Sequence, residues 1–107
     1  MEEKRRATRR TLKHYMSVFD RHSHAYLGML VELSDSGFKL TSPKKIELQL
    51  SYHLALADSP TLNEADTIAF FEAASIWCEQ KSGAFYDSGF KFVEVSHLTK
   101  EIFQDLL

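Results

Sequence analysis

Two groups of residues in the first third of the chain carry side chains suited to holding a charged ligand. Residues 5–10 read Arg-Arg-Ala-Thr-Arg-Arg, and an arginine fork pairs with a phosphate in a bidentate geometry that lysine does not offer. Residues 32–37 read Glu-Leu-Ser-Asp-Ser-Gly, which supplies a carboxylate and a hydroxyl for further hydrogen bonds. A small anion held by the arginines is the chemistry that these groups indicate.

The Glu32–Gly37 segment ends a stretch whose apolar and polar residues alternate, as in a strand with one buried face. We expect Glu32 and Ser34 to share the outer face. Gly37 is expected to supply the positive φ with which the chain reverses, and a serine at the start of such a turn can bond its own backbone. The predicted buried face consists of Ala25, Leu27, Met29, Val31 and Leu33.

Length and composition indicate one globular domain. The chain has 107 residues, of which 44% are hydrophobic and 12% aromatic, which is enough for one core. Its single cysteine, Cys78, excludes an intramolecular disulfide and fits a reducing compartment. Residues 1–4 do not read as a signal peptide, and Glu72 interrupts the longest apolar run, so we expect a cytoplasmic protein without membrane insertion.

Charge is divided unevenly along the chain. Residues 1–24 hold seven Lys and Arg against three acids, whereas residues 25–107 hold six against twelve. An acidic body would repel a phosphate backbone over most of its surface, which argues against binding of DNA or RNA. We therefore divide the single domain into a basic N-terminal arm, residues 1–10, and a folded body, residues 11–107.

Periodicity in the body predicts about six strands, which can close into a small antiparallel β-barrel. A hairpin over residues 20–24 is expected to join the first two strands. Phe70-Phe71 and Ala73-Ala74 break the alternation over residues 67–79; the alanines would also suit a helix, but we favour a long strand with a bulge. The strongest alternation, over residues 46–54, places Ile46, Leu48, Leu50, Tyr52 and Leu54 on one face. Trp77, Phe90 and Phe92 are expected in the core.

The last twelve residues change to a helical period. Ser96 suits an N-cap, and the helix is predicted to pack over an open end of the barrel. Its inward face is predicted to comprise Leu98, Ile102, Phe103 and Leu106.

An arginine-rich arm followed by a carboxylate-x-Ser-x-x-Gly turn in a six-stranded barrel resembles the PilZ family of cyclic di-GMP receptors. The marks of that family are Arg-x-x-x-Arg, often with the first arginine doubled, and [Asp/Asn]-x-Ser-x-x-Gly. Arg5, Arg6 and Arg10 match the doubled form, and Arg5 with Arg9 offers a second match. The turn departs only at its first position, Glu32. Ile76-Trp77, residues 88–93 and the final helix extend the resemblance to about residues 5–106.

The resemblance implies a bacterial second-messenger receptor whose arm orders as a clamp on cyclic di-GMP, with no other cofactor. Arginine can bind guanine O6 and N7 or a phosphate, and the turn carboxylate can accept from guanine N1–H and N2–H. The resemblance also implies a protein effector that recognises the ligand-bound form with the arm closed. Whether the chain forms a homodimer is not decided by the sequence. The implied ligand-binding residues are Arg5, Arg6, Arg9, Arg10, Glu32, Ser34 and Gly37.

Other functions remain as alternatives. A PilZ-like module without nucleotide binding would contact motility or secretion machinery through its protein surface. An OB-like barrel for single-stranded nucleic acid would require exposed aromatics on one face, and the acidic body counts against it. The sequence shows no nucleophile, base and orienting group with catalytic spacing, so we do not expect an enzyme. His22 and His24 fit a polar turn better than a metal site.

Overall fold

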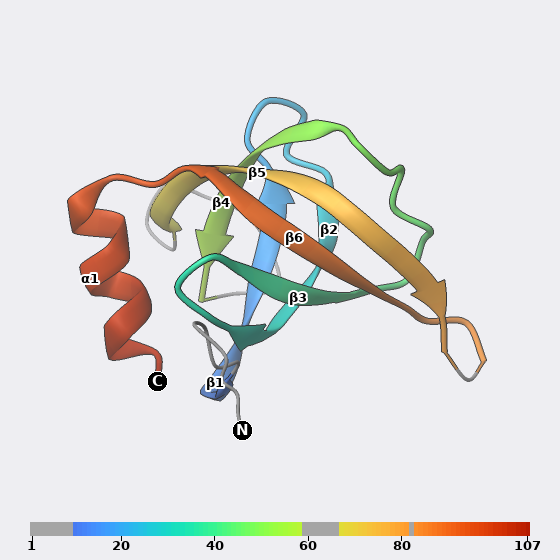
Figure 1. Cartoon of the computed structure of the whole chain (residues 1–107), viewed down its shortest axis with the longest axis horizontal. Helices are drawn as coiled ribbons and strands as arrows, with labels where there is room; N and C mark the ends of the chain where they lie inside the picture. The colour runs from blue at the N-terminus through green and yellow to red at the C-terminus, as the bar shows by residue number, and fades with distance from the viewer. Residues whose placement is uncertain (1–9, 59–66, 82) are drawn as a thin grey trace, which may run out of the picture.

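A closed barrel of six antiparallel strands, followed by one helix, makes up the described part of the chain (Figure 1). The computed structural model describes residues 10–58, 67–81 and 83–107, with side chains from Tyr15 onward. The strands neighbour one another in the order β1-β2-β3-β6-β5-β4, and β1 pairs with β4 to close the barrel. The predicted fold class is therefore confirmed. The elements are β1 (Arg10–Asp20), β2 (Tyr26–Leu33), β3 (Gly37–Ser42), β4 (Ser51–Ala57), β5 (Thr67–Gln80), β6 (Tyr86–Glu94) and α1 (His97–Asp105).

The middle of strand β2 departs from the predicted buried face. Gly28, Leu30 and Leu33 are buried, whereas Met29 is 37% exposed. The cause is a register shift between Leu30 and Glu32 in the pairing with β3, because an extra residue in one strand reverses the faces beyond it. Leu33 therefore faces inward and Leu27 packs against the core, both as predicted, whereas the inward placement of Met29 was wrong.

The strand predicted over residues 46–54 begins later, at Ser51. Gln49 has a φ of 61°, a left-handed conformation that interrupts an extended chain. Leu48 and Leu50 are consequently 45% and 44% exposed, although Ile46 is buried. Alternation had placed all three on one buried face, and that prediction was wrong for the two leucines.

Strand β5 is long and bulged, as predicted from its broken alternation. Its register shifts against β6 between Glu72 and Ala73 and again between Ser75 and Trp77. A hairpin joins it to β6. These shifts bend the strand so that it runs around the barrel and pairs with β4 as well.

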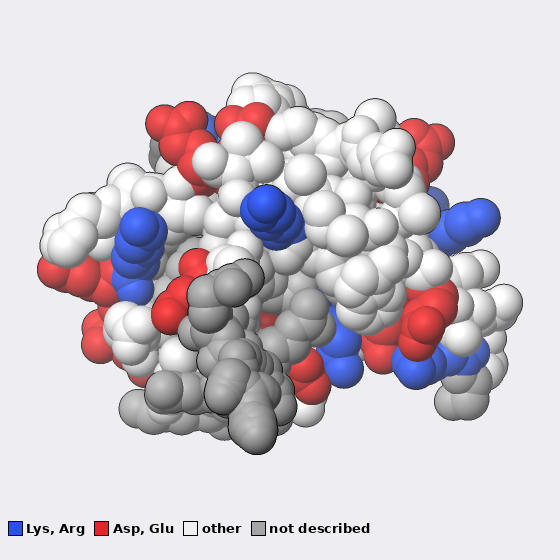
Figure 2. All heavy atoms as spheres, in the orientation of Figure 1, with Lys and Arg blue, Asp and Glu red and all other residues white. Residues whose placement is uncertain are grey.

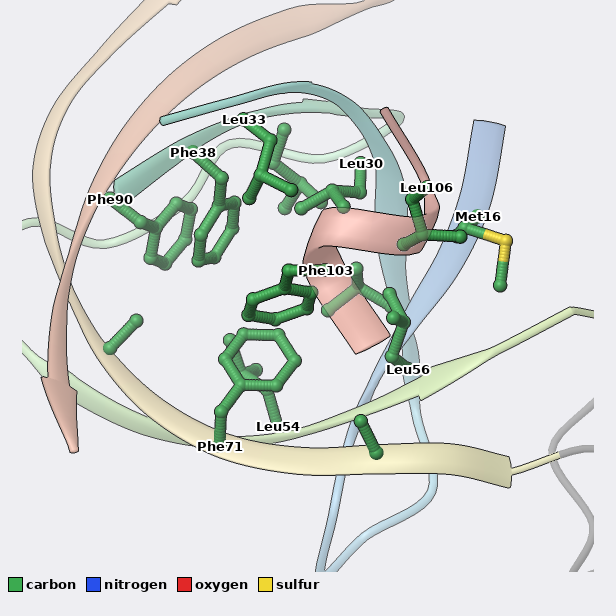
Figure 3. Close-up of a cluster of buried hydrophobic side chains, with 14 of the residues drawn as sticks. Met16, Leu30, Leu33, Phe38, Leu54, Leu56, Phe71, Phe90, Phe103 and Leu106 are labelled. Atoms are coloured by element: carbon green, nitrogen blue, oxygen red, sulfur yellow. The ribbon is translucent and has the colours of Figure 1, made fainter. Parts of the chain in front are cut away.

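Helix α1 completes the core from one side of the barrel (Figure 1). Ser96 caps it, since its Oγ accepts the Thr99 N–H at 3.1 Å. Phe103 and Leu106 join the buried cluster, and the Phe103 ring meets Phe71 edge to face at 5.3 Å (Figure 3). Leu98 is 67% exposed, so its predicted inward placement was wrong. Among the described residues, no helix has the length and apolarity to span a membrane.

Candidate functional site

Ser34 begins the turn between β2 and β3, and its side chain closes that turn. The Gly37 N–H donates to Ser34 Oγ at 3.2 Å, and the Ser34 N–H donates to the Gly37 carbonyl oxygen at 2.9 Å. The Ser34 hydroxyl also lies within donating distance of that carbonyl, at 3.2 Å. The expected bond from a serine to its own turn is thus confirmed, and its single proton is already used within the turn.

Gly37 serves close packing rather than backbone reversal. Within the described residues, Gly83 is the only glycine with a positive φ, so the conformational reason given for Gly37 was wrong. A Cβ at Gly37 would overlap the carbonyl oxygen of Phe90 in β6. The Phe92 N–H, from the same strand, donates to the Ser36 carbonyl oxygen at 2.9 Å. The turn is therefore held rigidly against β6.

Glu32 lies on the outer face of the barrel, as predicted, beside a lysine of β3. Lys39 Nζ is 3.2 Å from Glu32 Oε2 and 3.9 Å from Asp87 Oδ2. Thr41 Oγ1 donates to the other oxygen of Asp87 at 2.8 Å. The side chains of Glu32 and Lys39 are only 31% and 24% exposed, so solvent screens this pair less than a fully exposed one.

The only tryptophan, Trp77, lies two strands away from Lys39 and is linked to it through strand pairing. Lys39 pairs with Gly89 of β6, and Gly89 pairs with Trp77 of β5. The Trp77 indole occupies the space that a Cβ of Gly89 would need. Trp77 is outside the buried cluster, so its predicted place in the core was wrong, whereas Phe90 is buried and Phe92 packs against the cluster. The bulge before Trp77 explains the difference, because alternation cannot be counted through it.

Of the four predicted arginines, only the last lies within the described chain. Arg10 belongs to β1 and pairs with Leu33, and Thr11 pairs with Glu32. The backbone of Arg10 is therefore next to the strand end that leads into the Ser34–Gly37 turn. Its side chain, and all of Arg5, Arg6 and Arg9, lie outside what the structure describes.

Two hollows flank the turn. The smaller, called here the outer-face hollow, has a volume of about 310 Å³ and is lined by Tyr15, Met29, Val31, Glu32, Lys39 and Thr41. The larger, called the turn–helix groove, has a volume of about 740 Å³. Its walls are Leu33, residues 34–36 of the turn, residues 91–95, and Lys100, Phe103, Gln104 and Leu107.

Charged side chains on the face shown in Figure 2 are dispersed. Lys and Arg stand singly or beside acidic groups, without a continuous basic area on the part of this face that is described. A duplex or a single strand is bound by tracks of cations along its phosphates.

Sequence reasoning missed Lys39, Asp87, Tyr15 and Met29 as neighbours of the turn. Alternation over Phe38-Lys39-Leu40 could have indicated that Lys39 points outward. Its partner Asp87 is 48 positions further on, and only the register of β3 on β6 brings the two together. Met29 was assigned to the wrong face by the unpredicted bulge.

Comparisons with known proteins leave the site to be interpreted from its own chemistry. No protein-family model matches the chain, and no curated protein or solved structure matches it significantly. Among the described residues, no group of three or more His, Cys, Asp or Glu is placed to hold a metal ion. His22 and His24 lie at the β1–β2 connection, where the ring of His22 instead meets that of His53 at 5.3 Å.

Proposed function

We propose that this chain is a PilZ-like receptor for cyclic di-GMP, which it holds between the arginine arm and the Glu32–Gly37 turn. The observation that supports this most is the pairing of Arg10 with Leu33. It brings the end of the arginine cluster beside a turn that follows more than twenty positions later in the sequence. The last arginine of the first motif thereby lies beside the second motif, as a ligand shared by the two would require.

Chain length allows the other arginines to contribute. Each residue extends a chain by at most about 3.5 Å, so Arg6 can lie anywhere within about 14 Å of Arg10. By the same rule Arg5 can reach about 18 Å from Arg10, and Arg9 is its neighbour in the chain. Guanidinium groups within that distance can pair with the two phosphates of the ligand or with a guanine edge.

The turn contributes shape and a carboxylate. Its hydrogen bonds to Gly37 and its attachment to β6 keep Ser34 and Glu32 at fixed positions, and a preorganised site loses less entropy on binding. We propose that arm closure over this fixed surface creates the state read by a protein effector.

Isothermal titration with cyclic di-GMP tests the proposal. Wild type should bind, and Arg6→Ala and Arg10→Ala should each weaken binding about tenfold or more, since a bidentate contact contributes roughly 1–3 kcal/mol. Ser34→Ala should also weaken binding, because it removes the hydrogen bonds to Gly37 that hold the turn in place. Lys81→Ala is a matched control because Lys81 is an exposed cation paired with Glu79 on the β5–β6 hairpin. Unchanged affinity in all three variants would refute the proposed site.

A second candidate is a PilZ-like interaction module that binds no nucleotide. Leu48, Leu50 and Ile76 are 45%, 44% and 52% exposed. The Gln49 N–H donates to the Ser75 carbonyl oxygen at 2.9 Å, which sets these apolar residues near one another. Absence of binding heat in a protein that still unfolds cooperatively would favour this candidate over the first.

A further inference from the structure

The outer-face hollow is lined both by apolar or aromatic side chains and by a charged pair. Tyr15 is 50% exposed and Met29 is 37% exposed, and both line the hollow together with the Glu32–Lys39 pair. A planar ring that enters it would cover these apolar side chains and meet the charged pair at its edge. Aromatic side chains stack on nucleobases, and methionine adapts its shape to flat apolar surfaces.

The charged pair has a fixed order of donor and acceptor. Strands β2 and β3 pair Glu32 directly with Lys39, and their charged atoms lie 3.2 Å apart. Asp87 also lies 3.9 Å from Lys39 Nζ, and Thr41 holds Asp87 by a hydrogen bond of 2.8 Å. Lys39 therefore keeps a carboxylate neighbour if Glu32 turns towards a ligand.

We propose, resting on the function proposed above and on the Glu32–guanine contact that the resemblance implies, that Lys39 sets base specificity by donating to O6 of a guanine held in the outer-face hollow. Guanine presents one acceptor, O6, beside two donors, N1–H and the 2-amino group. Lys39 supplies the matching donor, and the two oxygens of Glu32 accept from N1–H and the 2-amino group. Tyr15 and Met29 bear on the face of the ring.

Adenine presents the reverse order on this edge, with a donor at N6 and an acceptor at N1. It would place a donor against Lys39 and leave the carboxylate of Glu32 without its partners. Polar groups left unpaired in a partly buried site reject a ligand strongly. The subsite thus selects guanine over adenine, and Lys39 is the residue that sequence motifs do not identify.

The test compares cyclic di-GMP, cyclic di-AMP and cyclic di-inosine monophosphate, which lacks the 2-amino group, by titration calorimetry. Wild type should bind the inosine form about tenfold more weakly than cyclic di-GMP. Lys39→Met should weaken cyclic di-GMP binding about tenfold and reduce its preference over cyclic di-AMP. Tyr15→Ser should weaken binding by a similar factor through lost stacking. Lys81→Met, in which another Lys–Glu pair is broken, should change nothing.

The possible failures are distinguishable. If wild type does not bind cyclic di-GMP, both the function and the subsite are wrong. A second result would overturn only the guanine subsite. In it, wild type binds cyclic di-GMP and Arg10→Ala weakens that binding, but wild type binds the inosine form as tightly as cyclic di-GMP, and Lys39→Met and Tyr15→Ser bind cyclic di-GMP as tightly as wild type. The inosine comparison uses wild-type protein, so this result does not depend on the folding of any variant.

Discussion

At the level of single residues, Glu32 is the one position at which the turn differs from the PilZ motif that it resembles, and its length suits the place where it lies. Its carboxylate reaches Lys39 Nζ at 3.2 Å across the β2–β3 pairing. An aspartate at this position would be one methylene shorter and would draw the acceptor back towards the strand. The departure therefore changes the reach of the site, and it retains the charge.

We expect Glu32→Asp to weaken cyclic di-GMP binding about tenfold, because an acceptor displaced by about 1 Å loses most of the benefit of a preorganised site. Titration calorimetry measures the change. Glu101→Asp is the matched control, since it makes the same shortening on α1 in an exposed pair with His97. Tighter binding by Glu32→Asp would contradict the expectation and show that the extra methylene obstructs the ligand.

Gly37 is a second residue whose role follows from contacts. Gly37→Ala should lower the free energy of unfolding by about 1–3 kcal/mol, because the added Cβ must displace the backbone of β6 at Phe90. Urea unfolding measures this loss. Gly83→Asn provides the comparison, because the φ there is +72° with open space around it, and asparagine tolerates that conformation. Equal midpoints for the two variants would refute the packing argument.

At the level of elements, the existence and order of the strands and the helix were predicted better than their ends and their buried faces. The bulge in β5 was visible because Phe70-Phe71 and Ala73-Ala74 break alternation. In β2 the apolar run Met29-Leu30-Val31 is compatible with burial of either face, and the register shift after Leu30 decides which residues face inward. That shift depends on the partner strand, so the sequence of β2 alone does not specify it. The left-handed residue Gln49 likewise gave no warning, because the common residue for that conformation is glycine.

The N-cap of α1 gives an element-scale prediction. Ser96→Ala should lower the free energy of unfolding by about 1 kcal/mol, because Ser96 Oγ accepts the Thr99 N–H. Chemical denaturation measures the effect. Ser96→Asp keeps an acceptor at the helix start and should retain most of the stability. A loss of equal size in both variants would mean that the hydroxyl acts elsewhere, such as in its bond to Thr99 Oγ1 at 3.0 Å.

The β1–β2 connection gives a prediction on pH. The backbone N–H groups of Ser23 and His22 donate to Asp20, and the bond from Ser23 contributes most to lowering the pKa of that carboxyl below its usual value. A carboxyl group whose pKa is lower in the folded state stabilises the protein at pH values above its unfolded-state pKa of about 3.9. That stabilisation is lost as the pH falls through the folded-state pKa.

Urea midpoints measured between pH 7 and pH 2 check this. At neutral pH the urea midpoint of the wild type should be higher than that of Asp20→Ala, and this difference in midpoint should shrink below about pH 4. Asp20→Asn keeps an acceptor without titrating, so its difference from Asp20→Ala should stay constant. A wild-type advantage that persists unchanged at pH 2 would exclude ionised Asp20 as its source.

At the scale of the whole molecule, β1 joins the site to the barrel. It carries Arg10 beside the turn at one end and closes the sheet against β4 at the other. Ligand binding at the arm should therefore stabilise the fold as a unit. At a ligand concentration of about 100 times Kd, the gain is about 2.7 kcal/mol, which corresponds to a rise in Tm on the order of 10 °C.

Thermal unfolding with and without cyclic di-GMP measures this rise. Arg10→Ala should show a smaller one at the same ligand concentration. An unchanged Tm for wild type at saturating ligand would contradict binding to the folded state.

The candidate site was predictable to the extent that it is local in sequence. The Ser34 turn and its internal bond follow from neighbouring residues, and so did the outward position of Glu32. Lys39, Asp87 and Thr41 meet only through the registers of β2, β3 and β6, which a single sequence does not specify.

Trp77 gives the protein a spectroscopic probe of its own. It is the only tryptophan, and its indole lies over Gly89, whose other neighbour is Lys39. Intrinsic emission from this protein therefore reports from a single location on the outer surface. A change in the charges around Lys39 should shift the emission maximum or the intensity of Trp77 fluorescence. Such a change can therefore be followed in the unlabelled wild-type protein.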